Sequence, residues 1–226
     1  MEYNELRLVR QALKAGSMAM ISPLRKQRDL DRKEKTYQDL LDAAIEAFGD
    51  KGYHGSLISD IVARAGVGQG TFYRHFNDKR ELFDAIMDRF GRMLLGEFDV
   101  MTTHLPGNAE QYRKASRDAL LAMAALVEKN RKLVLVLLRE APTVDREFEQ
   151  RLNELFDQFA SLAAFYLDYA VSQGFARPCN TGIVAQAIVG MALRHITKWL
   201  QNDPKALDID ELITELVDFA FFGFGA

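Results

Sequence analysis

Five polar side chains within seven residues could bind nucleic acid. Gln69, Thr71, Tyr73, Arg74 and His75 can all donate hydrogen bonds to phosphates or base edges. Glutamine matches the hydrogen-bonding edge of adenine and arginine matches that of guanine. Gln69, Thr71 and Arg74 are therefore the candidates for base contacts.

Two short amphipathic segments would have to position these side chains. One apolar face comes from Ile58, Ile61, Val62 and Ala65, and the other from Phe72 and Phe76. A glycine at position 66, between the segments, permits a tight turn with positive φ. This arrangement is how a helix-turn-helix places its second helix in the DNA major groove.

A longer set of spaced positions resembles the TetR family of one-component transcriptional regulators. The set comprises Ala47-Phe48, Gly52-Tyr53, Ile61, Ala65-Gly66-Val67, Gly70 to Phe76, Lys79, Glu81, Leu82 and Phe83. The resemblance covers residues 36 to 90, and the remainder matches only in being helical and of suitable length. Val62 and Gly68 depart from the family, which usually has alanine and often serine or threonine at these positions.

The resemblance implies an all-α fold of about nine helices. A basic extension over 1–31 would precede a helix-turn-helix head over 32–80 and a ligand-binding and dimerisation body over 81–226. Tyr73, His75 and Lys79 would contact phosphates, with backbone amides at the start of the fourth helix adding to the site. Tyr73 could also partly brace its own helix while its hydroxyl stays free to bind phosphate. The alternative for His75 is a buried or solvated histidine.

Charge is unevenly distributed along the 226 residues, whose net charge is −3. Residues 1–35 carry nine basic and five acidic groups, whereas residues 81–226 are acidic. Arg32, Lys33 and Lys35 could follow the DNA backbone or enter the minor groove. Residues 1–31 are either a weakly ordered basic tail or an arm that adds DNA contacts.

Other classes of protein lack support in the sequence. The single cysteine, Cys179, forms no internal disulfide and is interpreted as an inert thiol. No signal peptide and no apolar run of ~20 residues occur, so the protein is expected to be cytoplasmic. The four histidines show no metal-binding spacing, and no catalytic residue, metal or cofactor is predicted. An enzyme of the helical-bundle type would need convergent polar groups that the body lacks.

Helical periodicity and breaking residues predict the elements. We expect a first helix from Thr36, paired with Asp39 in a capping box, to Gly52, and a cap for the fourth helix at Asn77 or Asp78. Further helices are expected at 109–129, around 133–138 up to Pro142, and at 143–173, 180–201 and 208–222. The run 133–138 also has the propensity of a buried strand, but its charged flanks favour a helix.

The body offers apolar and aromatic side chains for an adaptable pocket. The candidates are Phe90, Met93, Met123, Phe156, Phe159, Tyr166, Met191 and His195. Each could instead be plain core, and His195 a satisfied polar contact. The composition hints at a hydrophobic effector such as a drug, a lipid or a fatty-acyl derivative.

The last two helices carry more apolar surface than a lone pair should expose, which favours a homodimer. The resulting hypothesis is a dimeric repressor released from a pseudo-palindromic operator on double-stranded DNA by an apolar small molecule. The alternative is a regulator or adaptor of the same fold controlled by a protein partner.

Overall fold

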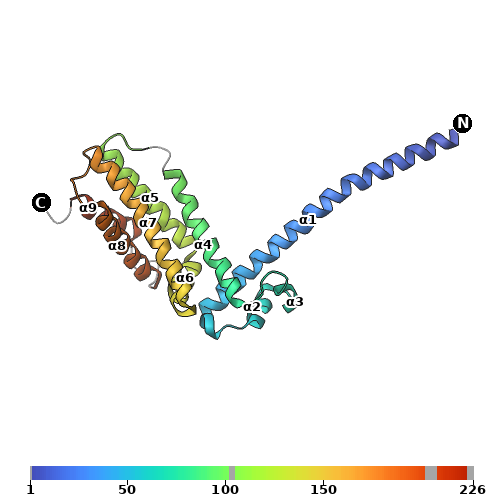
Figure 1. Ribbon diagram of the computed structural model, residues 1–226, viewed down its shortest axis with the longest axis horizontal. Helices are drawn as coiled ribbons and strands as arrows, with labels where there is room; N and C mark the ends of the chain where they lie inside the picture. The colour runs from blue at the N-terminus through green and yellow to red at the C-terminus, as the bar shows by residue number, and fades with distance from the viewer. Residues whose placement is uncertain (1, 102–104, 202–207, 223–226) are drawn as a thin grey trace.

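The computed structural model is helical over the residues that it describes. These are 2–101, 105–201 and 208–222 for the backbone, and 25–94, 105–201 and 208–222 for the side chains. They form nine α-helices and no strand, which confirms the all-α prediction. Helices α4 to α9 make up the body, α2 and α3 lie at one end of it, and α1 projects away from both (Figure 1).

Helix α1 (Glu2–Gly55) is much longer than the sequence predicts. The predicted start at Thr36 is wrong, because the Thr36 hydroxyl donates to the Arg32 carbonyl at 2.9 Å and caps nothing. No glycine or proline occurs between residues 24 and 48, so no residue there breaks the helix. The predicted stop at Gly52 is present as a kink, since its backbone is non-helical at φ 74° and ψ 166°, and the helical segment beyond it runs to Gly55. The boundary predicted at residue 31 falls inside α1.

The head consists of the C-terminal half of α1, α2 (Ile58–Ala65) and α3 (Gln69–Phe72), followed by α4 (Lys79–Met101). Gly66 ends α2 in the left-handed region, at φ 65° and ψ 29°, as the predicted tight turn requires. Asp78 caps α4 by accepting the Glu81 amide at 2.8 Å. The predicted cap is thus confirmed and assigned to Asp78.

The body adds five helices to α4. They are α5 (Ala109–Lys129), α6 (Arg131–Val144), α7 (Arg146–Ser172), α8 (Thr181–Gln201) and α9 (Ile209–Phe222). α8 packs along α7, and α9 packs on α5 through Ala124, Ile213 and Val217. The run 133–138 is helical and largely buried, as predicted.

The predicted end of α6 at Pro142 is wrong by two residues. Pro142 lies inside the last turn, where it removes only its own hydrogen bond, so the helix continues to Val144. Asp145, in extended conformation, then separates α6 from α7 and caps α7 by accepting the Phe148 amide at 3.0 Å. The predicted start of α7 at residue 143 therefore moves to Arg146.

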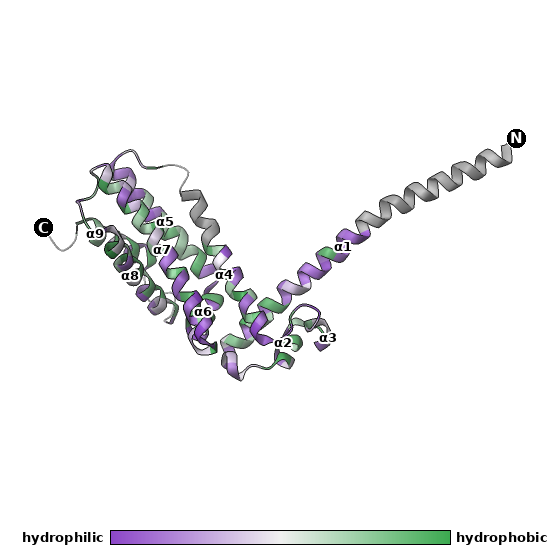
Figure 2. Cartoon of the chain, in the orientation of Figure 1, coloured by the Kyte–Doolittle hydropathy of each residue, from purple (hydrophilic) through white to green (hydrophobic). Residues whose placement is uncertain are grey.

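One buried core passes through both head and body. Its largest fully buried members include Phe48 and Phe72 in the head, Phe83 on α4 and Phe148 on α7. Phe83 joins the two parts, because its ring centroid lies 5.8 Å from that of Phe48 and 5.0 Å from that of Phe148. Figure 2 shows apolar stretches along the body helices, whereas the described part of α1 outside the head is mostly hydrophilic.

Candidate DNA interface and effector body

The recognition segment, residues 68–76, is built from one short helix and a tightened turn. Gly68 precedes α3 in extended conformation, and α3 itself has only four residues. The chain continues as turns in which the His75 and Phe76 amides both donate to the Phe72 carbonyl, at 2.8 and 2.9 Å. Phe72 and Phe76 are buried at 0% and 3% exposure, and they anchor the segment to the core.

The remaining side chains of this segment face outward. Gln69 and Arg74 are exposed, Thr71 is half-buried, and Tyr73 has 56% of its surface exposed. The Arg74 guanidinium donates to the Thr71 hydroxyl at 2.9 Å, which orients it without neutralising its charge. The Tyr73 ring rests edge-on against Phe72, so the predicted bracing and a free phenol hydroxyl occur together.

His75 connects the recognition segment to α1. Its ring centroid lies 6.1 Å from that of Tyr37, whose ring also stacks on Phe76 at 5.1 Å. Partial burial lowers the pKa of His75 below its ordinary value, and the nearby charges of Lys33 and Arg74 lower it further. The imidazole is therefore neutral near pH 7 and available as a neutral hydrogen-bond donor.

Lys79 points into the protein in this structure. Its ammonium donates to the Tyr53 carbonyl at 2.6 Å and the Ser56 carbonyl at 2.9 Å, and lies 4.4 Å from the Tyr53 ring centroid. Burial lowers the pKa of this amine. One further donor remains for a phosphate, so the role predicted for Lys79 stays a prediction.

Two amides at the start of α4 are also engaged within the chain. The Glu81 amide donates to Asp78, and the Asn77 amide donates to the Glu81 carboxylate at 2.6 Å. Both amides already donate to carboxylates of the chain, although they lie where amides were predicted to bind a phosphate.

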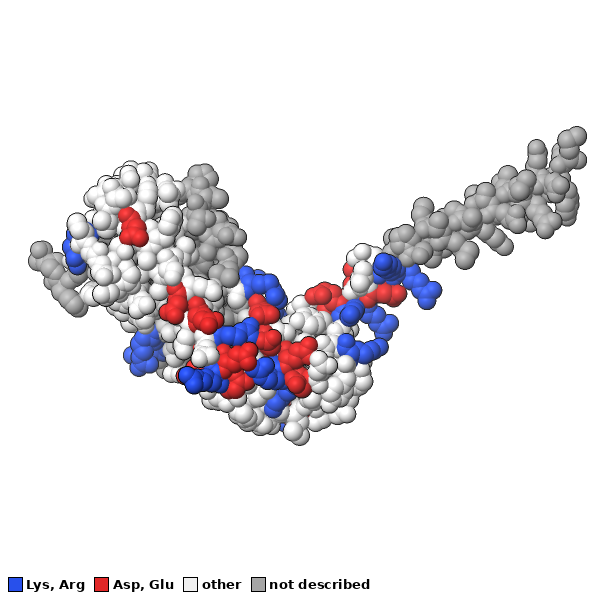
Figure 3. Space-filling view, viewed as in Figure 1, with Lys and Arg blue, Asp and Glu red and all other residues white. Residues whose placement is uncertain are grey.

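Arg32, Lys33 and Lys35 are all exposed on α1. None of the three forms an ion pair with an acidic side chain among the described residues. Figure 3 shows blue side chains, with red ones among them, on the visible face of the described part of α1. Lys33 lies near the recognition segment, since its charge acts on His75. An unpaired cation in that position suits a phosphate-binding surface.

Hydrogen bonds between a backbone group and a side chain join the head to α6 and begin a junction between head and body. The Tyr53 amide donates to the Glu140 carboxylate at 2.7 Å, and His54 Nε2 lies 2.7 Å from the Thr143 carbonyl oxygen. Gly52 permits this approach, since a Cβ atom there would lie 3.3 Å from Glu140 Oε2. These bonds could not be predicted, because no local spacing links residues 53 and 140.

Ion pairs between α4 and α7 continue the same junction. The Arg80 guanidinium donates to Asp145 at 2.9 Å and to Glu147 at 2.6 Å. Arg151 on α7 pairs in return with Asp84, and with Asp88 at 2.7 Å. Figure 3 shows basic and acidic side chains alternating over this area.

The Phe148 amide and the Arg80 guanidinium hold the pKa of Asp145 below its ordinary value. Asp145 is therefore a carboxylate at neutral pH and can cap α7 and bind Arg80 at the same time.

The candidate effector residues fall into two groups. Phe90 is buried in the main core, and Met93, Met123, Phe156 and Phe159 pack against it. Tyr166, Met191 and His195 are half-buried and are not among the residues of that core. His195 Nδ1 lies 2.9 Å from the Met191 carbonyl oxygen, which fits the polar contact considered for it.

Two buried polar atoms in the body have no partner among the residues that the structure describes. They are the Tyr166 hydroxyl and the Trp199 indole nitrogen. Burial raises the pKa of Tyr112 to about 12, and proximity to Tyr166 adds to that shift. Since an unpaired buried hydroxyl is costly, Tyr166 is a candidate anchor for a polar atom of an effector.

Two negative findings concern the residues that the structure describes. No helix there is long and apolar enough to cross a membrane. No group of three or more His, Cys, Asp or Glu side chains there could hold a metal ion.

The chain is similar in sequence to known bacterial regulatory proteins. The family model "Bacterial regulatory proteins, tetR family" matches residues 40–86. The fatty acid metabolism regulator protein of Bacillus subtilis is 23% identical over 180 residues, covering 78% of this chain and 89% of that protein.

Solved structures share the fold. FadR from Bacillus subtilis in complex with stearoyl-CoA has a TM-score of 0.69 and 22% identity, over 83% of this chain and 99% of that one. AibR in complex with isovaleryl coenzyme A and operator DNA has a TM-score of 0.63 and 25% identity, over 82% and 98% of the two chains.

Proposed function

This chain belongs to the TetR family of DNA-binding transcriptional regulators, and on that premise we propose that it is a dimeric repressor controlled by an acyl-coenzyme A. In this proposal residues 32–80 are the DNA-binding head and residues 81–226 the effector-binding and dimerisation body. The described residues ahead of the head belong to α1, the helix that leads into it.

The single observation that supports DNA binding is the arrangement of buried and exposed side chains in the recognition segment. Phe72 and Phe76 fix it from beneath, while Gln69, Tyr73 and Arg74 project outward. We assign Gln69, Thr71 and Arg74 to base edges, because their hydrogen-bonding groups match those exposed in the major groove. Tyr73, His75, Arg32, Lys33, Lys35 and Lys79 are assigned to phosphates.

Two relatives support an acyl-coenzyme A as the effector. FadR was crystallised with stearoyl-CoA and AibR with isovaleryl coenzyme A. The apolar side chains of Phe90, Met93 and Phe156 suit the hydrocarbon part of such a ligand. The unpartnered Tyr166 hydroxyl would donate to the thioester carbonyl. Met123, Phe159, Met191 and His195 complete the proposed lining.

An exposed stripe on α8 supports dimerisation. Ile183 is 68% exposed, and Ala187 and Gly190 are exposed at the helical spacing that places all three on one face. A Cβ atom at Gly190 would meet nothing within 4 Å in a single chain. Small residues on such a face allow close approach of a second helix, so α8 and α9 are the proposed interface. A two-fold dimer then requires a pseudo-palindromic operator.

The junction provides a path from effector to DNA. Phe90 and Met93 lie on α4, the helix that also carries Arg80 and Asp84. A ligand that displaces α4 would change the position of the head relative to the body. The ligand lowers operator occupancy only if it prefers the arrangement of the heads that does not fit DNA.

The test is binding of the full-length protein to labelled DNA from upstream of its own gene, in competition with random DNA. Stearoyl-CoA, isovaleryl-CoA and free coenzyme A are then titrated in turn. Specific binding that an acyl-CoA weakens, and free coenzyme A does not, supports the proposal. The Arg74→Gln variant should lose specific binding while its circular dichroism spectrum stays unchanged.

The second candidate is a regulator of the same fold controlled by a protein partner. The exposed apolar side chains Phe165 and Phe222, at 55% and 64% exposure, are compatible with it. Specific operator binding that no acyl-CoA of any chain length alters would favour this candidate over the first.

A further inference from the structure

Residues 25–35 of α1 carry a basic face without ion-paired acidic partners among the described side chains. At about 100° per residue, the six cations of this stretch fall within an arc of about 180°. They are Arg25, Lys26, Arg28, Arg32, Lys33 and Lys35. None of them forms an ion pair among the residues whose side chains the structure describes. Asp29 shares this arc, so the face is basic without being uniform.

The acidic side chains on the other side of α1 are engaged by glutamines. Asp31 accepts from Gln27 at 2.8 Å, and Glu34 accepts from Gln38 at 2.9 Å. Neither carboxylate forms an ion pair with a cation of this face, so the cationic side chains remain available to a partner.

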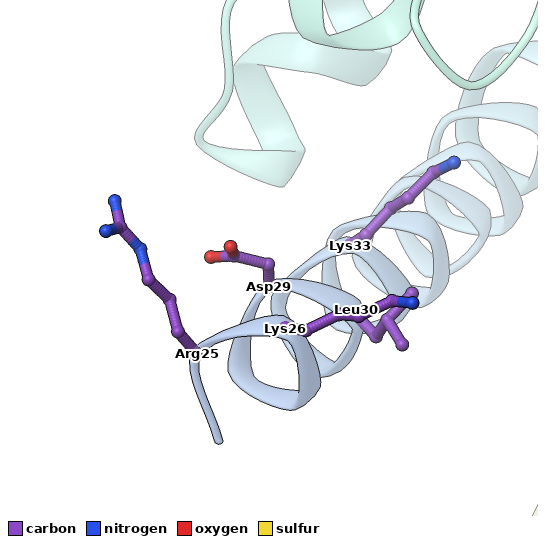
Figure 4. Close-up of a pocket in the computed structure, with 5 residues that line it drawn as sticks. All are labelled: Arg25, Lys26, Asp29, Leu30 and Lys33. Atoms are coloured by element: carbon purple, nitrogen blue, oxygen red, sulfur yellow. The ribbon is translucent and has the colours of Figure 1, made fainter. Parts of the chain in front are cut away.

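One stripe of this helix leads to the recognition segment. Lys26, Leu30, Lys33 and Tyr37 follow one another at helical spacing, and Tyr37 packs on Phe76. Figure 4 shows Lys26, Leu30 and Lys33 pointing to one side of α1, and Arg25 and Asp29 to the other. The edge of the basic face that Lys26 and Lys33 form is thus continuous with the surface that we assign to DNA.

The distance along the helix sets how far this face extends. From Tyr37 to Lys26 the rise is about 16 Å, at 1.5 Å per residue. For a helix that runs parallel to the duplex, with one phosphate pair every 3.4 Å, this corresponds to about five base pairs. Cations at that distance from α3 would meet phosphates outside the bases that the recognition segment reads.

We propose that Arg25, Lys26 and Arg28 form a second phosphate-binding face, which holds duplex DNA flanking the operator half-site. Duplex DNA fits this face better than a membrane surface does. Leu30 is the only large apolar residue between positions 25 and 35, whereas an interfacial helix needs a whole apolar face. The inference rests on the proposed function, because it extends the same DNA surface.

The experiment compares full-length protein with the Arg25→Gln/Lys26→Gln variant. A matched control, Lys114→Gln/Arg177→Gln, removes two exposed charges from the body. Operator affinity is measured from 50 to 300 mM salt, and hydroxyl-radical footprints are recorded. Glutamine retains helix propensity, and circular dichroism checks that helix content is unchanged.

The expected result is a slope of log affinity against log salt that becomes shallower by about 0.9 for each phosphate that the variant no longer binds. Protection should shrink at both outer ends of the footprint, and the control should behave like the unchanged protein. The charge-reversed variant Arg25→Glu/Lys26→Glu should bind the operator more weakly than the glutamine variant does.

Unchanged slope and footprint in the first variant would overturn this inference while leaving specific operator binding intact. Weaker binding to vesicles of anionic lipid, with unchanged DNA binding, would overturn it in favour of a membrane partner. Absence of specific binding by the unchanged protein would instead refute the proposed function itself.

Discussion

The turn between α2 and α3 allows us to predict the loss of stability on substitution of its glycine, because the backbone conformation alone sets that loss. Gly66 has φ 65° and ψ 29°, and a Cβ atom there would meet nothing within 4 Å. Gly66→Ala therefore adds no collision and costs only the strain of an L-residue in the left-handed region. That strain is about 1–2 kcal/mol of unfolding free energy. Gly66→Asn should lose less, because asparagine tolerates this conformation.

Gly52→Ala is the matched comparison, since it combines strain with crowding. Its φ of 74° and ψ of 166° lie in a region open essentially only to glycine, at a cost of order 1–3 kcal/mol. The new Cβ atom would also lie 3.3 Å from Glu140 Oε2, the acceptor of the Tyr53 amide. The loss at position 52 should therefore exceed the loss at position 66.

Urea denaturation followed by circular dichroism measures the free energy of unfolding of each variant. The dependence of that free energy on urea concentration is compared between variants. The expected order of stability is unchanged protein, Gly66→Asn, Gly66→Ala and Gly52→Ala. A Gly66→Ala variant as stable as the unchanged protein, or no more stable than Gly52→Ala, would refute the reasoning from backbone conformation.

Three further predictions concern other parts of the molecule. Because the pKa of His75 is below 6.5, its ring gains charge only in acidic solution, so operator affinity should rise as the pH falls below 6.5. His75→Gln should remove that rise in a binding titration, and identical pH profiles would contradict the assignment. Tyr166→Phe removes an unpaired buried hydroxyl, so it should raise the free energy of unfolding without ligand by about 1 kcal/mol and weaken the acyl-CoA response. A loss of stability in the ligand-free variant would argue against an unpaired hydroxyl. Ile183→Arg should leave each chain folded and halve the mass found by light scattering, whereas an unchanged mass would exclude this α8 face as the interface.

The head could be predicted in detail because its signals are local. A glycine at position 66 fixes the turn, and the spacing of Phe72 and Phe76 fixes which face of the segment is buried. The start of α1 could not be predicted, because Thr36 and Asp39 resemble a cap in sequence. Helix formation continues through them wherever no residue interrupts it.

The junction escaped prediction for a different reason. Glu140 and Tyr53 are 87 residues apart, and Arg80 and Asp145 are 65 apart. Such pairs form only after the helices have packed, so a single sequence gives no signal for them. Lys79 illustrates the same limit, since the family resemblance implied a phosphate contact but gave no signal for the bonds that its ammonium donates to the Tyr53 and Ser56 carbonyls.

The junction also bears on how this chain can be recombined with its relatives. Partners of the head lie on α6 and at the start of α7, from Lys132, which pairs with Glu46 and Asp50, to Glu147, which pairs with Arg80. A chimera that joins this head to a foreign body at residue 80 would separate each of these side chains from its partner. Engineered sensors should instead exchange residues 46–88 and 132–151 together, so that the transplanted unit includes both halves of every bond.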